Sequence, residues 1–209
     1  MLPALSDWGR ENPDPTGERL ILQPFLPSVN AYDAIARPHE VSDWGPFEWA
    51  GDMSAEDWIE HIPAMTTALA YMHSQGKVVG EAILPNLVFT EDGLPIWVDA
   101  EVSYRREIPT LQQHAFDLRN LTLSLSSSLR QRMGAAFDTH SVVTAVVNAY
   151  PEPAVLQQLA ALLEKPLPWC QRLAMNEFMR YRIGAGSNEQ YEHVRHVLRE
   201  QISRVLEGK

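Results

Sequence analysis

The stretch from Tyr71 to Glu101 decides the fold of this chain and reads YMHSQGKVVGEAILPNLVFTEDGLPIWVDAE. It opens at the end of a helical pattern, and Gly76 supplies the signal that ends the helix. Two short runs rich in β-forming residues, 87–89 and 96–98, flank a turn signal at 91–93. We therefore predict a loop and then a β-hairpin after the helix.

Polar residues stand at fixed intervals along this stretch. The helix ends in a His-x-x-Gly motif that begins at His73. Glu81 precedes Asn86 by five positions, and Asp99 follows Asn86 by thirteen. The hairpin would bring Asn86 and Asp99 to the same end of two paired strands. This order resembles the catalytic core in the C-terminal lobe of protein-kinase-like phosphotransferases.

The resemblance implies a role for each of these residues. In kinases an Asn and an Asp grip the magnesium ions that bridge the phosphates of ATP, and an acid orients the acceptor hydroxyl. By resemblance, Asn86 and Asp99 hold magnesium and ATP, and Glu81 occupies the position of the catalytic base. Asp117 matches a buried helix Asp that accepts hydrogen bonds from the catalytic-loop backbone, which is a structural role.

Several positions depart from the family pattern. Glu81 replaces an Asp and is one methylene longer, and a misplacement of about 1 Å can cost on the order of a hundredfold in rate. Val79, Gly80 and Ile83 stand where the family has His, Arg and Lys. Glu101, two positions after the metal-binding Asp, is reminiscent of small-molecule and lipopolysaccharide kinases.

The N-terminal lobe of the family is expected to be reduced or absent. No lysine precedes Lys77 and no Gly-x-Gly-x-x-Gly motif precedes Glu81, although kinases use both features to hold phosphates. Residues 19–25 read as a strand that leads into the hinge, and residues 30–35 as the short helix after it. We expect an α+β, mainly helical fold, a kinase-like C-lobe with a short catalytic-loop hairpin.

Helical signals surround the hairpin. Ser54 and Asp57 form a capping box, and Pro63 is expected to kink the following helix or to mark its first turn. The core-facing residues of that helix are Ile62, Met65, Leu69 and Met72. Further helices are predicted at 111–132, 141–149, 153–164, 169–182 and 189–206. The serine-rich run 124–128 lacks the Gly-x-Ser-x-Gly turn of a hydrolase nucleophile and is interpreted as a helix end or loop.

Length and composition indicate one globular domain. The chain has 209 residues, of which 45% are hydrophobic, enough to bury a sizeable core. We divide it into an N-terminal arm and hinge-like strand (1–56), a kinase-like core (57–165) and a C-terminal helical elaboration (166–209). The single cysteine, Cys170, excludes an internal disulfide. Neither a signal peptide nor a membrane span is visible, so we expect a cytoplasmic protein.

Charge is unevenly distributed along the chain. Residues 1–104 contain 17 Asp and Glu against 4 Lys and Arg, a balance of 4 − 17 = −13. Residues 105–209 contain 10 against 13, a balance of 13 − 10 = +3. The acidic half disfavours nucleic acid as a partner, because binding to phosphate backbones depends on Lys and Arg.

A second protein chain is the expected partner, or else the chain forms a homo-oligomer. A C-lobe without its N-lobe exposes apolar surface, and such surface generally marks an interface. We expect that residues 1–60, with Trp44, Phe47 and Trp49, fold back over this surface, or that a second chain completes it. The acidic balance favours a basic partner.

Three functions are consistent with these patterns. The missing lysine and Gly-rich loop favour a degenerate kinase-like protein, or pseudokinase, that acts mainly by protein–protein binding and binds magnesium-nucleotide weakly. One alternative is an active atypical phosphotransferase, a small-molecule or protein kinase, that uses Glu81 as its base. A second alternative is an interaction scaffold that binds no nucleotide.

Overall fold

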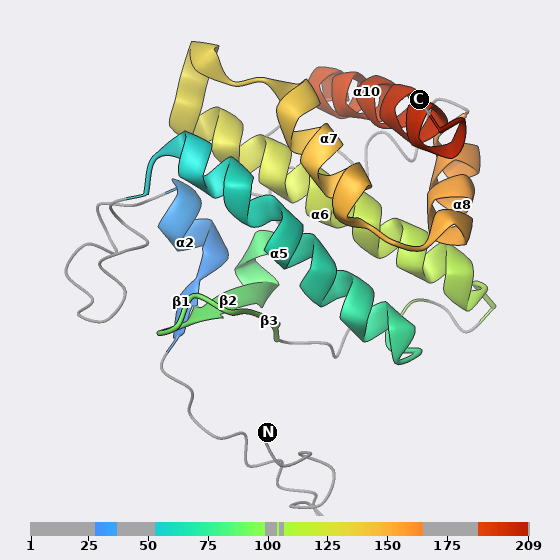
Figure 1. The fold of residues 1–209 in the computed structure, drawn as a ribbon, viewed down its shortest axis with the longest axis horizontal. Coiled ribbons are helices and arrows are strands. Elements are labelled where there is room, and N and C mark those ends of the chain that lie inside the picture. Colours follow the sequence, from blue (N-terminus) through green and yellow to red (C-terminus); the bar gives the residue numbers. More distant parts are fainter. Residues whose placement is uncertain (1–27, 37–52, 99–103, 105–106, 165–187, 209) are drawn as a thin grey trace, which may run out of the picture.

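The computed structural model describes residues 28–36, 53–98, 104, 107–164 and 188–208, which form a small sheet beside a group of helices (Figure 1). In chain order the elements are β1 (Ser28–Asn30), α2 (Ala31–Ala36), α5 (Ala55–Ser74), η2 (Leu84–Asn86), β2 (Leu87–Thr90), β3 (Pro95–Trp97), α6 (Thr110–Met133), η3 (Gly134–Ala136), α7 (Thr139–Ala149), α8 (Pro153–Leu163) and α10 (Asn188–Leu206). This architecture confirms the α+β, mainly helical class. The predicted strand 19–25, the predicted helix 169–182, Cys170, and the aromatic residues Trp44, Phe47 and Trp49 lie outside the described residues.

Helix α5 begins with the predicted capping box. The Ser54 hydroxyl accepts a hydrogen bond from the Asp57 N–H at 3.1 Å, and the Asp57 carboxylate accepts one from the Ser54 N–H at 2.8 Å. Gly76 follows the end of the helix with a φ of +69°, a left-handed conformation that favours glycine. Pro63 lies inside the helix, beyond its first turn. Local signals therefore set both ends of α5.

The sheet is antiparallel, in the order β1-β2-β3. Leu87 of β2 pairs with Trp97 of β3, which confirms the predicted hairpin. Strand β1 is not foreseen by the sequence analysis, and it pairs with β2 so that Val29 lies opposite Phe89. These four side chains are buried, so one face of the sheet belongs to the core.

The short helix predicted at 30–35 is α2, which begins one residue later than expected. Asn30 ends β1 instead, and its Oδ1 accepts hydrogen bonds from the N–H groups of Tyr32 at 2.8 Å and Asp33 at 3.3 Å. An Asn at this position satisfies backbone donors that the first turn of a helix leaves unpaired. Asn30 therefore turns the chain from strand into helix.

Helix α6 runs through the middle of the helical group and contacts α2, α5, α7, α8 and α10. The predictions at 111–132, 141–149, 153–164 and 189–206 are confirmed as α6, α7, α8 and α10. The interpretation of 124–128 as a helix end or loop is wrong, because this run lies inside α6 and is buried. The Ser124 hydroxyl accepts a hydrogen bond from the Leu84 N–H at 3.0 Å. Small serine side chains thus let the loop before the hairpin approach the helix closely.

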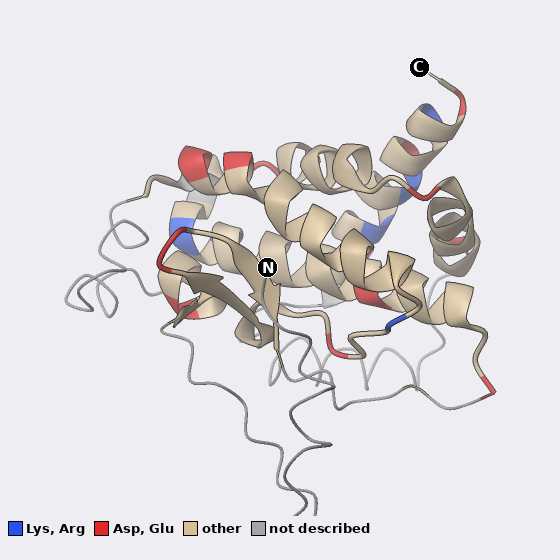
Figure 2. Ribbon diagram, turned by 60° about the horizontal axis from the view of Figure 1, so that its bottom comes forward, with Lys and Arg blue, Asp and Glu red and all other residues tan. Residues whose placement is uncertain are grey.

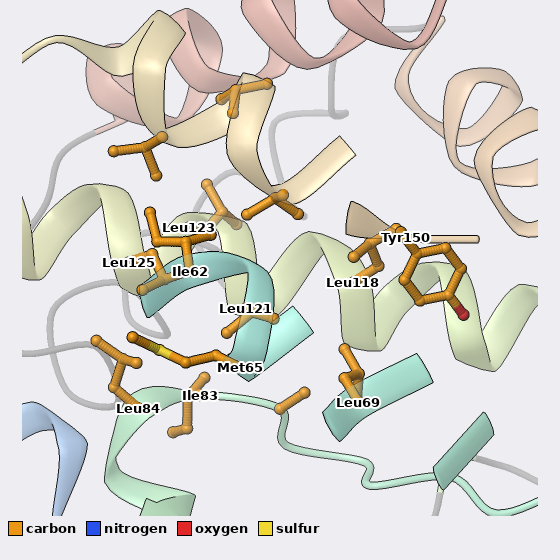
Figure 3. Packing of buried hydrophobic residues seen from close by; sticks show 14 of the residues in the cluster. Ile62, Met65, Leu69, Ile83, Leu84, Leu118, Leu121, Leu123, Leu125 and Tyr150 are labelled. Carbon is orange, nitrogen blue, oxygen red and sulfur yellow. The ribbon is translucent and has the colours of Figure 1, made fainter. Parts of the chain in front are cut away.

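The core is one continuous cluster that includes residues from the sheet and the helices. Figure 3 shows Met65 and Leu69 of α5 facing Leu118 and Leu121 of α6, with Ile83 of the intervening loop beside them. Helix α10 contributes Tyr191, Val194, Val197, Leu198 and Ile202 to the same cluster. No helix in the described part of the chain combines the length and apolar character needed to cross a membrane.

Candidate functional site

The candidate site is built on the loop that joins α5 to the hairpin. Gly80 lies at the centre of this loop, is buried, and has a φ of +85°, which favours glycine. The Ile83 N–H donates to the Glu81 carbonyl at 2.8 Å, and the Asn86 N–H donates to the Ile83 carbonyl at 2.9 Å. These short-range bonds fold the loop tightly between α5 and η2.

Asp117 of α6 holds this loop through its carboxylate. One oxygen accepts the Val79 N–H at 2.9 Å, and the other accepts the Gly80 N–H at 3.0 Å. The Tyr104 hydroxyl donates to the second oxygen at 2.9 Å. Asp117 is 0% exposed, so protein groups alone solvate its carboxylate. Hydrogen bonds to a charged acceptor are stronger than neutral ones, and the carboxylate therefore fixes the loop backbone firmly.

His73, from the His-x-x-Gly motif, is a further partner of Asp117. Its Nε2 lies 3.2 Å from the Asp117 carboxylate, and its Nδ1 lies 2.6 Å from the Tyr150 hydroxyl. A carboxylate only accepts, so Nε2 carries the proton and donates it to Asp117. In the neutral imidazole Nδ1 then accepts from Tyr150. One chain of hydrogen bonds therefore joins α5 and α6 to Tyr150, the residue that follows α7, beneath the loop.

A second histidine, His114, stacks on His73 with a ring-centroid distance of 4.0 Å and an interplanar angle of 8°. Its Nε2 lies 3.1 Å from the Lys77 carbonyl oxygen and donates to it. Burial lowers the pKa of His114 first, and the neighbouring His73 lowers it further. Two stacked imidazoles cannot both be charged without repulsion, so the fold favours neutral His114.

The two tyrosines of the network remain protonated at neutral pH. Burial raises the pKa of the Tyr104 hydroxyl, and the Asp117 charge raises it further. Burial also raises the pKa of Tyr150, again with a contribution from Asp117. Both hydroxyls therefore keep the proton that each can donate in the network.

Asn86 lies at the base of the hairpin and contacts Glu81 of the same loop. The Asn86 Nδ2 donates to the Glu81 backbone carbonyl at 2.9 Å. The Val98 N–H donates to the Asn86 carbonyl at 2.9 Å, so the residue that precedes Asp99 is joined to Asn86 through the backbone. Asp99 itself lies outside the described residues, as does Glu101.

The structure thus brings three of the four predicted site residues into one region. Glu81 and Asn86 are in contact, and Asp117 lies beneath the loop through Val79 and Gly80. No function is predicted from the sequence for His73, His114, Tyr104 or Tyr150. The signal for His73 was its place in the His-x-x-Gly motif, whereas nothing near His114, Tyr104 or Tyr150 in the sequence indicated their contacts.

The polar network does not resemble a transition-metal centre. Within the described residues, no group of three or more His, Cys, Asp or Glu side chains is placed to hold a metal ion. Magnesium, by contrast, is commonly held by only one or two carboxylates together with substrate phosphates. No protein-family model, curated protein or solved structure matches this chain, so its site is interpreted from its own geometry.

Proposed function

We propose that this chain is a degenerate kinase-like protein that works chiefly by binding another protein and holds magnesium-nucleotide weakly through Asn86 and Asp99. The observation that carries the proposal is the pair of hydrogen bonds from Val79 and Gly80 to Asp117. They are the bonds expected for Asp117 if the loop is a catalytic-loop relative. They support a kinase-like arrangement of Glu81 and Asn86 above α6.

The geometry of Asn86 supports a role in magnesium binding. Its Nδ2 is engaged by the Glu81 carbonyl, and no donor among the described residues hydrogen-bonds to its Oδ1. An amide oxygen is a hard ligand of the kind that magnesium accepts. Together with the Asp99 carboxylate it would hold the ion, which would neutralise phosphate charge when bound.

Two features of the sequence argue for weak nucleotide binding and slow catalysis. Residues 1–76 contain no lysine, the residue with which kinases pair the phosphates. Glu81 stands in place of the Asp base. Groups that act as a unit in catalysis are costly to lose, so phosphoryl transfer near background is expected.

A titration of ATP with and without magnesium tests the nucleotide part of the proposal. We expect weak binding that requires magnesium and is lost in Asn86→Ala and Asp99→Ala. Asp92→Ala is the matched control, because Asp92 is an exposed acid in the turn of the same hairpin. Tight binding in EDTA, or binding that Asp99→Ala leaves unchanged, would overturn the assignment.

Radiolabelled phosphate transfer tests the catalytic part. Glu81→Ala should leave the near-background rate unchanged, whereas Glu81→Asp restores the family's acid and should raise the rate if ATP is bound correctly. Robust autophosphorylation that Glu81→Ala abolishes would instead support the active phosphotransferase.

A further inference from the structure

The face of the sheet that points away from the core is apolar along β3 and at Val88, and it is polar along β1 and at Thr90. Side chains alternate between the two faces of a strand, so the buried Leu87, Phe89 and Trp97 place their neighbours on the opposite face. That outer face carries Val88 and Ile96, which pair with each other and are half-buried. It also carries the more exposed Leu94 and Val98, which are 61% and 37% exposed. We call these four residues the outer sheet face.

Acidic residues border this face. The turn between β2 and β3 contains Glu91 and Asp92, both exposed, next to Leu94 (Figure 2). The strands and the turn between β2 and β3, residues 28–30 and 87–98, hold these two acids and no Lys or Arg. An apolar patch with one sign of charge at its rim is typical of an interaction surface, where the rim selects partners of opposite charge.

We propose that the outer sheet face binds a basic, apolar segment of a second polypeptide. The inference rests on the proposed function, since it gives the protein-binding activity a surface and a partner chemistry. Leucine, valine or isoleucine side chains of the partner pack on Leu94, Ile96 and Val98, and its Lys or Arg side chains pair with Glu91 and Asp92.

The chain's own segments are poor candidates for this surface on grounds of charge. Residues 1–27, next to β1, hold four acids and two arginines, a balance of 2 − 4 = −2. Residues 37–52, next to α2, hold four acids and one arginine, a balance of 1 − 4 = −3. Both segments therefore carry the same sign of charge as the rim.

Residues 165–187, by contrast, form a basic segment. It holds one acid against four Lys and Arg, a balance of 4 − 1 = +3. It is joined to α8 and α10, which contact α6, α7 and each other and lie across α5 from the sheet (Figure 1). A separate chain is thus the occupant that the charge of residues 1–27 and 37–52 favours, and the unfolding measurement below tests residues 165–187 as the alternative.

Fluorescence anisotropy on the full chain tests the proposal with a labelled peptide of alternating leucine and lysine. We expect saturable binding that weakens as salt is added. Leu94→Ser/Ile96→Ser should weaken binding at least about tenfold, and Glu91→Lys/Asp92→Lys about three- to tenfold. Tyr71→Ser and Glu164→Lys are the controls and should leave binding unchanged, because Tyr71 is 66% exposed on α5 and Glu164 is exposed at the end of α8.

Several outcomes would overturn the proposal. The proposal fails if the peptide does not bind, or if the control variants lose as much affinity as the outer-sheet-face variants. It also fails if peptides with Glu in place of Lys, or with Ser in place of Leu, bind as tightly as the original peptide. Urea unfolding of the free protein gives a second measurement, and its midpoint should be the same in Leu94→Ser, at a position that is 61% exposed, and in the parent. A clear fall in this midpoint would show that another segment of the same chain covers this face. If the parent protein is a dimer and the same variant is a monomer, the outer sheet face binds a second copy of this chain.

These results can be separated from a failure of the proposed function. If the peptide does not bind but ATP binds with magnesium, the surface is wrong and the kinase-like interpretation stands. If the peptide binds and ATP does not, the surface stands without the nucleotide site.

Discussion

At the scale of single residues, Asp117 organises the candidate site. Its fully buried carboxylate accepts from two backbone N–H groups, a tyrosine and a histidine. A buried charge is stable only when such partners replace water. The same partners would be left unsatisfied if the carboxylate were removed, which makes this residue costly to change.

We expect Asp117→Ala to lower the free energy of unfolding by about 3 kcal/mol, because it leaves buried donors without acceptors. Asp138→Ala is the matched control. Asp138 is an exposed N-cap of α7 that accepts from the His140 and Ser141 N–H groups, and its loss should cost about 1 kcal/mol. Urea unfolding measures both changes. Equal losses in the two variants would contradict the central role of Asp117.

The lowered pKa of His114 predicts how the stability of the fold depends on pH. The fold lowers its pKa below the ordinary value of 6.5, so below pH 6.5 the unfolded chain takes up a proton that the folded chain resists. Neutral His114 therefore makes its full contribution to the free energy of unfolding above pH 6.5, and this contribution is lost as the pH falls below 6.5. The groups that face the ring are His73 on the stacked side and Asp117 nearby.

His114→Gln should make the fall in stability below pH 6.5 shallower, since a Gln amide can still donate to the Lys77 carbonyl but does not titrate. His196→Gln, on the exposed side of α10, is the control and should keep the parent's slope. Unfolding curves at a series of pH values measure the effect. A slope that His114→Gln leaves unaltered would argue against this assignment.

At the scale of elements, Arg132 joins three parts of the chain. It extends from α6 and donates to the carbonyls of Ala34 and Ile35 at 3.1 Å, near the end of α2, and also to the Met53 carbonyl just before α5. The last carbonyls of a helix have no partner within the helix, so a cation there is favourable. Arg132 thus connects the end of α2 to the start of α5.

Arg132→Met keeps much of the side-chain volume but removes the donors. We expect it to lower the free energy of unfolding by about 1 to 2 kcal/mol. Arg130→Met, at an exposed position on the same helix, should change stability by less than about 0.5 kcal/mol. Thermal unfolding of the two variants and the parent is the measurement, and similar melting temperatures for both variants would contradict the connection.

At the scale of the whole molecule, helix α10 is part of the main core. It packs against α7 and α8, and its buried residues belong to the same cluster as those of α5 and α6. Leu198 is 0% exposed, whereas Val205, the next-to-last residue of the helix, is 38% exposed. The last described helix therefore stabilises the domain as a whole.

Leu198→Ala should lower the free energy of unfolding by about 2 to 5 kcal/mol, because it opens a cavity in the core. Val205→Ala should cost less than about 1 kcal/mol, since this side chain keeps much of its contact with water. Chemical denaturation followed by circular dichroism measures both. An unfolding curve of Leu198→Ala with two steps, the first of which loses only a small part of the helical signal, would indicate a separate unit instead.

The sequence by itself determined the features that depend on neighbouring residues. The capping box at Ser54, the end of α5 near Gly76 and the hairpin around Gly93 follow from interactions within a few positions. The helices after the hairpin follow from apolar periodicity. The expectation that Asp117 accepts hydrogen bonds from the loop backbone came from the family resemblance, and in the structure the Val79 and Gly80 N–H groups donate to its carboxylate.

Only the tertiary structure decided which distant residues meet. His73 and Asp117 are 44 positions apart, and His73 and Tyr150 are 77 apart. No local pattern encodes such pairs, because they form only when α5, α6 and α7 pack together. The pairing of β1 with β2 and the burial of the serines at 124–128 likewise depend on packing. Local hydrogen bonds and periodicity act over a few residues, whereas a buried polar network is assembled by the whole core.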